Sequence, residues 1–351
     1  MNTRELLKVL SNAHGLSGYE ENIRALIAEE IEPYVDDIRV DVMGNLIATQ
    51  ENGFRGPRVM LAAHMDEIGL MIKYIDDNGF AYFTTIGGWF DQTLFNMRFI
   101  LHGKFGDIYG VIGSKAPHMM NAEERKKMIE AKDMYIDFGA MTKEGAEAMG
   151  IGIGTPCTPD ITFQPLGNDR VTGKAFDNRA GCVMLIETLR RLHEENNIKA
   201  TIHAVFTVQE EVGLKGAKVA AYKLNPDVVL AMDVTLPGDH PGINLKEASV
   251  ELGKGPAVII SDAGGRGLIV PENVLNWLKE AGKDIPYQLE VSDGGTTDGA
   301  ATQLVREGIP TGVISVPCRY IHSVVSVLSM NDLENSICLL TYAIKIVDKH
   351  F

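Results

Sequence analysis

Residues 201–235, TIHAVFTVQEEVGLKGAKVAAYKLNPDVVLAMDVT, decide the fold class. The stretch begins with an apolar segment at 202–208, continues with an amphipathic segment at 216–224 and ends with a second apolar segment at 227–233. Apolar strands that alternate with amphipathic helices form sheets that helices cover on both faces, and such sheets are at least partly parallel. We therefore predict a strand, a helix and a second strand here.

The same alternation continues on both sides of this stretch. Helices are predicted at 3–12, 20–34, 179–195 and 272–282, and buried strands at 58–63 and 311–317. The predicted fold class is therefore α/β, with a mixed sheet flanked by helices.

A different pattern occupies residues 68–165. Short strand-like pieces such as LMIKYI at 70–75 and FAYFTTIG at 80–87 are separated by Gly and Asp-Asn-Gly turns, which is typical of a small all-β unit. One polar stretch, NAEERKKMIEA at 121–131, is predicted to be helical. We predict that 1–67 and 166–351 form a discontinuous α/β domain, and that 68–165 form a small all-β domain inserted into it.

Composition excludes several classes of protein. The length of 351 residues suits two domains. The net charge of −14, from 33 Lys and Arg against 47 Asp and Glu, argues against a nucleic-acid partner. The N-terminal residues lack the apolar run of a signal peptide, and no segment approaches about 18 uninterrupted apolar residues. We expect a cytoplasmic protein with no membrane partner.

Polar residues that can bind metals follow the predicted buried strands. Because ligands bind beyond the carboxyl ends of strands in open α/β sheets, we expect these residues to share one site. They are His64 and Asp66 after the first strand, Glu210 and Glu211 after the second, Asp233 at the end of the third, and His322 shortly after the fourth. Asp177, just before a predicted helix, is a further candidate ligand and lies at a fifth place in the chain, in addition to the four strand ends.

Two imidazoles and three carboxylates suit zinc, cobalt or manganese better than calcium or cuprous ion. Five such ligands fit two ions if one carboxylate bridges them. Asp66 would then orient the His64 ring, and Glu210 would be free to take a proton from water. Each residue also has an ordinary structural interpretation: Asp177 as a helix N-cap, Asp233 as a turn residue, and the glutamate pair as a solvated loop.

Five strings of this sequence resemble the motifs of one enzyme family. They are AHMDEIG at 63–69, AFDNRAG at 175–181, QEEVGLKGA at 209–217, MDVT at 232–235 and RYIHS at 319–323. These five strings resemble the motifs of the co-catalytic dinuclear aminopeptidases. They occur in the same order and are spread over nearly the whole chain. That family includes glutamyl and deblocking aminopeptidases, tetrahedral (TET) particles and proteins once labelled cellulases. The resemblance implies a zinc-peptidase-like catalytic domain, two divalent ions per subunit, zinc or cobalt, and removal of the N-terminal residue from short peptides.

The resemblance also implies a role for each site residue. It makes Asp177 the bridging ligand, Glu210 the general base and Asp66 a supporting catalytic acid beside His64. The implied ligands of one metal are His64, Asp177 and Asp233, and those of the other are Asp177, Glu211 and His322. It further implies that 68–165 form a dimerisation domain, that dimers assemble into a homododecamer, and that the loop Gly294–Ala300 lines the substrate pocket.

Two other functions remain open at this point. Glu210 with another carboxylate could serve as the acid/base pair of a glycoside hydrolase, although the histidines and the presence of only two tryptophans, Trp89 and Trp277, oppose it. A non-catalytic binding protein on the same fold is the second alternative.

Overall fold

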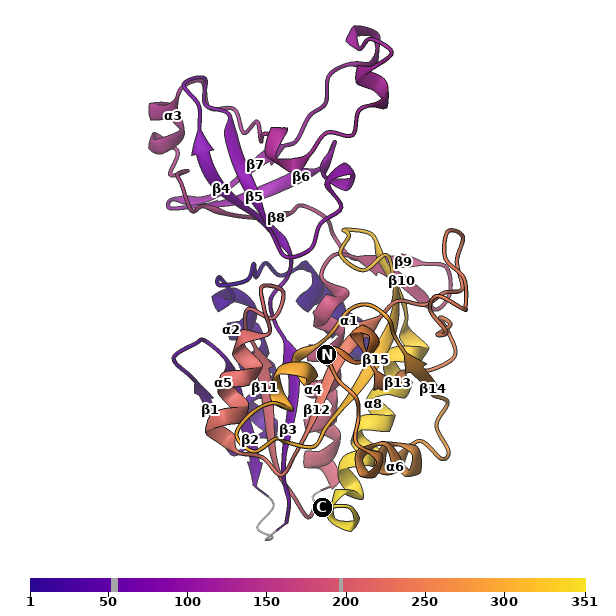
Figure 1. The fold of residues 1–351 in the computed structure, drawn as a ribbon. Coiled ribbons are helices and arrows are strands. Elements are labelled where there is room, and N and C mark those ends of the chain that lie inside the picture. Colours follow the sequence, from indigo (N-terminus) through magenta and orange to yellow (C-terminus); the bar gives the residue numbers. More distant parts are fainter. Residues whose placement is uncertain (52–55, 196–197) are drawn as a thin grey trace.

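A computed structural model describes residues 1–51, 56–195 and 198–351. Within these ranges the chain forms a large α/β lobe and a smaller lobe built on a second sheet (Figure 1). The predicted fold class, a mixed sheet flanked by helices with an inserted all-β unit, is confirmed.

The large sheet has 11 strands, and its centre is parallel. Strands β11, β3, β12 and β15 run parallel to one another, whereas the strands that adjoin this centre pair with it antiparallel. The order across the sheet is β1 (Asp37–Val40), β2 (Leu46–Glu51), β11 (Thr201–Thr207), β3 (Arg58–His64), β12 (Val228–Thr235), β15 (Thr311–Arg319), β16 (Ser326–Ser329), β10 (Arg170–Gly173) and β9 (Gln164–Leu166). Strand β13 (Ala257–Ser261) pairs with β15 and with β14 (Gln288–Val291).

Helices cover both faces of this sheet because its central strands are apolar on both faces. In β3, Leu61 packs in the larger core, and its neighbours Met60 and Ala62 pack in a smaller core on the opposite face. The larger core is closed by α1 (Thr3–Asn12), α2 (Glu21–Ile31), α4 (Phe176–Glu195), α6 (Glu272–Ala281) and α8 (Met330–Lys345). The opposite face carries α5 (Lys215–Leu224) and α7 (Asp298–Thr302).

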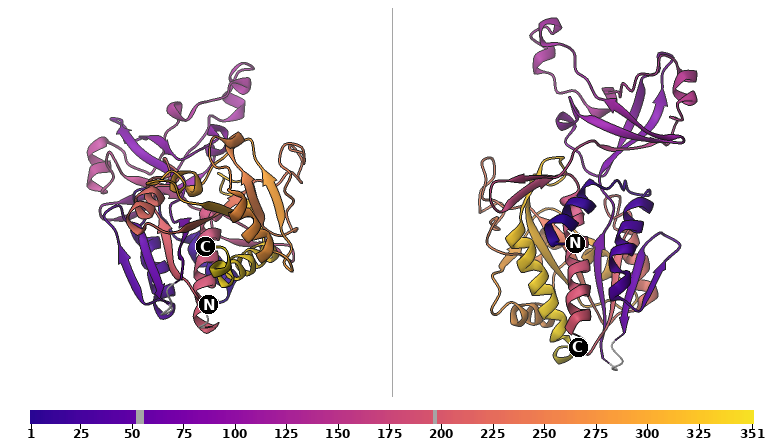
Figure 2. Two further views of the ribbon diagram at one scale, coloured as in Figure 1. Left: turned by 60° about the horizontal axis from the view of Figure 1, so that its bottom comes forward. Right: turned by 180° about the vertical axis from the view of Figure 1, so that it is seen from behind.

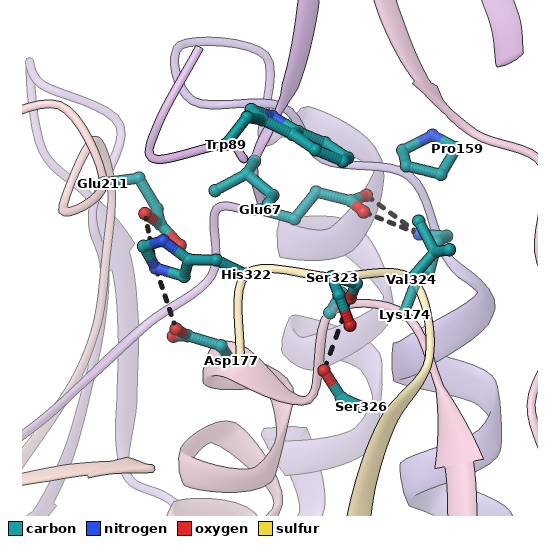
Figure 3. Close-up of a pocket in the computed structure, with 12 residues that line it drawn as sticks. Glu67, Trp89, Pro159, Lys174, Asp177, Glu211, His322, Ser323, Val324 and Ser326 are labelled. Atoms are coloured by element: carbon teal, nitrogen blue, oxygen red, sulfur yellow. Dashed lines mark hydrogen bonds and ion pairs between the residues drawn. The ribbon is translucent and has the colours of Figure 1, made fainter. Parts of the chain in front are cut away.

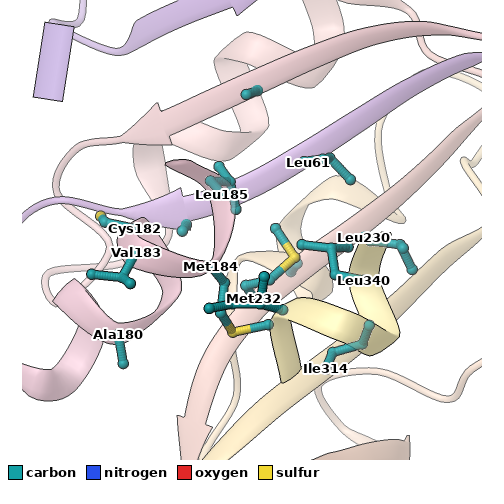
Figure 4. Close-up of a cluster of buried hydrophobic side chains, with 14 of the residues drawn as sticks. Leu61, Ala180, Cys182, Val183, Met184, Leu185, Leu230, Met232, Ile314 and Leu340 are labelled. Atoms are coloured by element: carbon teal, nitrogen blue, oxygen red, sulfur yellow. The ribbon is translucent and has the colours of Figure 1, made fainter. Parts of the chain in front are cut away.

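Helices α4 and α8 lie side by side on the rear face, as Figure 2 shows. Apolar side chains of α4, such as Met184 and Leu185, meet Leu61, Leu230 and Leu340 of the strands and of α8 (Figure 4). This packing holds the N-terminal end of α4 against the sheet. Among the described residues, no helix has both the length and the apolar composition needed to cross a bilayer.

The second sheet has five strands and a separate core. Its order is β5 (Ala81–Ile86), β4 (Gly69–Ile75), β8 (Pro156–Pro159), β6 (Arg98–Gly103) and β7 (Gly106–Val111), with α3 (Lys143–Ala148) beside it. The prediction of a helix at 121–131 is wrong. Only a 3-10 turn at Glu124–Lys126 and the start of another at Ala131–Asp133 form there. The larger apolar residues of the segment, Met128 and Ile129, are adjacent near its C-terminal end, so they form no apolar stripe that a helix could bury along its length.

Candidate active site

The predicted site residues meet at the carboxyl edge of the parallel strands. His64 ends β3, Glu210 and Glu211 follow β11, Asp233 lies in β12 two residues before its end, and His322 follows β15. Asp177 comes from the start of α4. Together with Asp66, all seven residues belong to one connected cluster of polar contacts.

Asp177 is not the residue that caps α4. Asp177 and Asn178 both depart from helical geometry, and the Asn178 Oδ1 accepts a hydrogen bond from the Gly181 N–H at 3.0 Å. Asn178 therefore supplies the capping oxygen. The carboxylate of Asp177 is left to contact the two histidines.

His64 lies at the centre of one half of the cluster. Its Nε2 is 3.1 Å from Asp177 Oδ1, 3.9 Å from Glu210 Oε2 and 4.0 Å from Asp233 Oδ1. Its Nδ1 is 3.2 Å from the carbonyl oxygen of Asp66. A carbonyl can only accept, so Nδ1 carries a proton, and Nε2, which faces the carboxylates, is the nitrogen that a metal would bind.

His322 lies at the centre of the other half. Its Nε2 is 3.3 Å from Asp177 Oδ2 and 3.4 Å from Glu211 Oε2. Figure 3 shows the ring of His322 between these two carboxylates. The two oxygens of Asp177 therefore face different histidines, which is the arrangement that a bridging carboxylate needs.

Asp66 holds the loop that carries both glutamates. Its two oxygens accept hydrogen bonds from the backbone N–H groups of Glu210 at 3.1 Å and Glu211 at 3.2 Å. The Ser17 hydroxyl donates a further bond at 2.6 Å. Asp66 is fully buried, so its charge orients His64 and this loop from behind the site.

Several backbone positions at the site are left-handed although they are not glycine. Ala175 has φ 56°, Gln209 has φ 56° and His322 has φ 57°. Each lies within two residues of a predicted ligand or is one. Such conformations cost of order 1–3 kcal/mol each and cluster where function requires a particular side-chain direction.

The charges of the cluster fit bound cations. Burial raises the pKa of Glu211 to about 8, and the charge of Asp177 adds to this rise. Burial, with the charge of Asp177, also raises the pKa of Asp233 well above its usual range. Glu211 Oε1 is buried and has no hydrogen-bond partner among the residues that the structure describes. Crowded buried carboxylates with an unsatisfied oxygen are stabilised by metal ions, so the donor set suits divalent metals.

Two groups of described residues offer ligand atoms within 4.8 Å of one another. One group is His64, Glu210 and Asp233, and the other is His64, Asp177 and Glu211. Both groups differ from the ligand sets that the family resemblance implies. The first contains Glu210 where the implied set has Asp177, and the second contains His64 where the implied set has His322. The position of Glu210 is therefore compatible with two roles, a base or a ligand.

The inserted unit reaches the site, a contact that no pattern in the sequence specifies. A Cβ on Gly88 would lie 2.7 Å from Nδ1 of His322, so only glycine allows this close approach. The neighbouring Trp89 lines a small hollow with Asp177, Glu211 and His322 (Figure 3), and its indole N–H donates to the Gly69 carbonyl at 3.1 Å. The Gly87-Gly88 pair was the available sequence signal.

A buried ion cluster behind the site was also missed. The Lys174 ammonium donates to both oxygens of Glu67 at 2.9 Å, and both side chains are 2% exposed. Arg179 lies 3.7 Å from Glu67 and donates to the Met65 carbonyl at 2.8 Å. Burial opposes ionisation of Glu67, but the charges of Lys174 and Arg179 hold its pKa below the usual value. Lys174 and Arg179 flank Asp177 in sequence, so this cluster anchors the segment that carries it.

Replacing Lys174 by methionine is expected to lower the free energy of unfolding by about 3 kcal/mol, because it leaves a buried carboxylate short of its main counter-charge. Urea denaturation measures the change. Lys115→Met is the matched control, since Lys115 pairs with Glu124 on the surface at 50% and 42% exposure and such exposed pairs contribute little to stability. Equal effects of the two substitutions would refute the anchoring role.

The cluster opens into a cleft of ≈ 880 Å³. The cleft is lined by His64, Asp177, Asp233 and both glutamates, and also by residues of β13, of β14 and of the loop 292–297. The predicted pocket loop, Gly294–Ala300, therefore contributes Gly294, Gly295, Thr296 and Thr297 to this lining. A substrate of the size of a short peptide can lie in such a cleft with one end at the cluster.

Comparison with known proteins adds independent information. The family model of the M42 glutamyl aminopeptidases matches residues 44–339. The lysyl aminopeptidase of Pyrococcus furiosus is 37% identical over 345 residues, which cover 95% of this chain and 94% of that protein.

The chain is also similar to solved structures of aminopeptidases. The TET aminopeptidase of a marine sediment archaeon of the Thaumarchaeota superposes with a TM-score of 0.94 at 39% identity, and the match covers 99% of this chain and 96% of that one. The TET1 peptidase of Pyrococcus horikoshii, which can assemble into a tetrahedron or a large octahedral shell, superposes with a TM-score of 0.88 at 34% identity over 98% and 99% of the two chains.

Proposed function

Because this chain belongs to the M42 glutamyl aminopeptidase family, we propose that it removes the N-terminal residue of short peptides at a centre of two divalent metal ions. Family membership makes it a hydrolase of the exopeptidase type. The proposed ligands are two imidazoles and three carboxylates: His64, Asp177, Glu211, Asp233 and His322. The observation that carries the proposal is that the two imidazoles meet different oxygens of Asp177, beside a cleft of ≈ 880 Å³ that the proposed ligands line.

Zinc and cobalt are the proposed metals, since imidazole and carboxylate donors suit both. When bound by these residues, two such ions would supply polarisation of the scissile carbonyl and a water whose pKa is lowered toward about 7. The side chains of the site would bind these ions and hold them in place. Asp177 would hold the two halves of the site together, and the unsatisfied Oε1 of Glu211 would gain a partner.

Glu210 is proposed as the general base. Burial raises its pKa well above the usual range, which suits a carboxylate that takes a proton from water and returns it to the leaving amine. Asp66 is a positioning residue in this scheme, because it acts through His64 and through the backbone of Glu210 and Glu211. The free amine of the substrate would face the carboxylates of the site, which limits cleavage to the first residue.

Assembly is part of the proposal. Large apolar side chains of the inserted unit are exposed, among them Phe105 at 72%, Met141 at 86% and Ile153 at 78%, and an interface between subunits would remove them from water. We propose that residues 68–165 form a dimer and that dimers assemble into a dodecamer. A closed particle of this kind would admit only short peptides. Light scattering gives the number of subunits.

A cytoplasmic location remains an expectation from the sequence.

The function is tested by metal removal. EDTA followed by desalting is expected to abolish hydrolysis of aminoacyl-coumarin substrates, and added zinc or cobalt is expected to restore it. A glycoside hydrolase would need no metal and would cleave a cellulose-derived substrate instead. A non-catalytic protein would do neither. Elemental analysis verifies that the metal has been removed. If the metal-free protein still has full peptidase activity, the proposal is refuted.

A further inference from the structure

The cleft beyond the proposed metal ligands is acidic. Apart from the proposed centre, its lining includes four carboxylates, Glu247, Asp262, Glu290 and Asp293. The part of the chain that the structure describes contributes no lysine or arginine to this lining. The cleft therefore presents negative charge to whichever side chain enters it.

Glu290 is the buried carboxylate among these four that lacks strong compensation. It lies in β14 and is 3% exposed. The Thr235 hydroxyl, at 2.9 and 2.8 Å from the two carboxylate oxygens, is the donor that it has among the described residues, and no cation there lies within 4.0 Å. By contrast, Asp262 accepts hydrogen bonds from the Leu268 N–H and the Thr296 hydroxyl, which hold its own loop.

The electrostatic state of Glu290 reflects this missing partner. Burial raises its pKa to about 6, and the charge of Asp262 contributes to the rise. At neutral pH the group is therefore mostly ionised. A buried ionised carboxylate without a counter-charge is costly, so a cation that enters the cleft would be stabilised there.

The separation between Glu290 and the proposed metal centre suits the length of a lysine side chain. Its donor Thr235 is two residues beyond Asp233 in β12, and alternate residues of a strand share a face about 7 Å apart. A lysine side chain spans about 6 Å from Cα to Nζ, from its bond lengths. Apolar side chains, including Leu236, Ile243 and Ile259, line the same cleft and can cover the methylene groups.

We propose that this cleft selects peptides with lysine or arginine at the N-terminus, and that the Glu290 carboxylate receives the cationic head of that side chain. The inference rests on the proposed aminopeptidase function and names its substrate class. An acidic first residue would meet like charge, and a leucine would leave Glu290 buried without a cation. A site built for a polar group discriminates strongly against residues that lack it.

The first test compares aminoacyl-coumarin substrates on the metal-loaded protein. Wild type is expected to show a higher kcat/KM for lysyl and arginyl substrates than for leucyl and glutamyl substrates. Glu290→Gln is expected to lower the ratio of lysyl to norleucyl kcat/KM by about 10- to 100-fold, as loss of a charge-assisted contact predicts. Glu307→Gln, which removes the same charge from an exposed glutamate outside the cleft lining, is the matched control and should leave the ratio unchanged.

The second test measures binding without turnover. Calorimetric titration with L-lysine and with L-norleucine, which has the same carbon chain but no side-chain ammonium, should show tighter binding of lysine by wild type and loss of this difference in Glu290→Gln. A wild-type preference for leucyl or glutamyl substrates, or an unchanged ratio in Glu290→Gln, would overturn the inference while leaving the aminopeptidase intact. Absence of hydrolysis of every aminoacyl substrate would overturn both.

Discussion

Glu210→Gln is expected to lower kcat by about 10²- to 10⁴-fold, because a positioned general base contributes that much to a hydrolysis. Glutamine has the same shape and keeps the backbone N–H that donates to Asp66 at 3.1 Å, so the loop should not move. It cannot take a proton from water. Steady-state kinetics on an aminoacyl-coumarin substrate measure the loss, and KM should change much less than kcat.

Metal analysis of the same variant decides between the two roles that the geometry allows. Glu210 Oε2 lies 3.9 Å from Nε2 of His64 and belongs to one of the two groups that could hold an ion. As a base, Glu210 can be replaced without loss of metal, whereas Glu211→Gln should lose part of it. Near-normal turnover in Glu210→Gln would remove its catalytic assignment, and a loss of one metal equivalent would reassign it as a ligand.

The strongly periodic parts of the fold could be predicted from the sequence. The strand, helix and strand expected at 202–208, 216–224 and 227–233 are found at Thr201–Thr207, Lys215–Leu224 and Val228–Thr235. Their patterns are clear because each strand is buried on both faces and the helix between them buries one side. The stretch at 121–131 has residues that favour helices, but its apolar residues do not recur at the helical period.

The cluster of site residues was also accessible to prediction, because strand ends share an edge of the sheet. Contacts that depend on the tertiary arrangement could not be predicted from the sequence. Gly88 lies against His322 from 234 positions away in the sequence, and no local pattern specifies this approach. Glu290 lies in a four-residue strand, QLEV, with two exposed apolar neighbours. Such a short segment has no periodicity that would mark its glutamate as a residue of the cleft.

The choice between Asp177 and Asn178 as helix cap illustrates the same limit. Both residue types are good N-caps, and they are adjacent in the sequence. Only the structure shows that the Asn178 side chain accepts from Gly181 while its Nδ2 donates to the Met232 carbonyl at 2.8 Å. This division of labour is what leaves Asp177 free to face both histidines.

Asp177→Asn is expected to reduce the bound metal below two equivalents per chain and to abolish most of the activity. Burial alone would raise the pKa of Asp177, but hydrogen bonds from His322 and His64 hold it below the usual range, so the residue is a carboxylate that serves both halves of the site. Asparagine keeps one oxygen and loses the charge, so it cannot give an anionic oxygen to each ion.

Elemental analysis after gel filtration in metal-free buffer measures this change directly. Asp284→Asn, at an exposed aspartate outside the cleft lining, is the control and should retain the wild-type metal content. The variant should also remain folded, because the buried cluster of Glu67, Lys174 and Arg179 anchors the segment around residue 177 independently of its carboxylate. Two full equivalents in a folded Asp177→Asn protein would show that the two ions do not share this residue, and the bridging assignment would then pass to another carboxylate of the cluster.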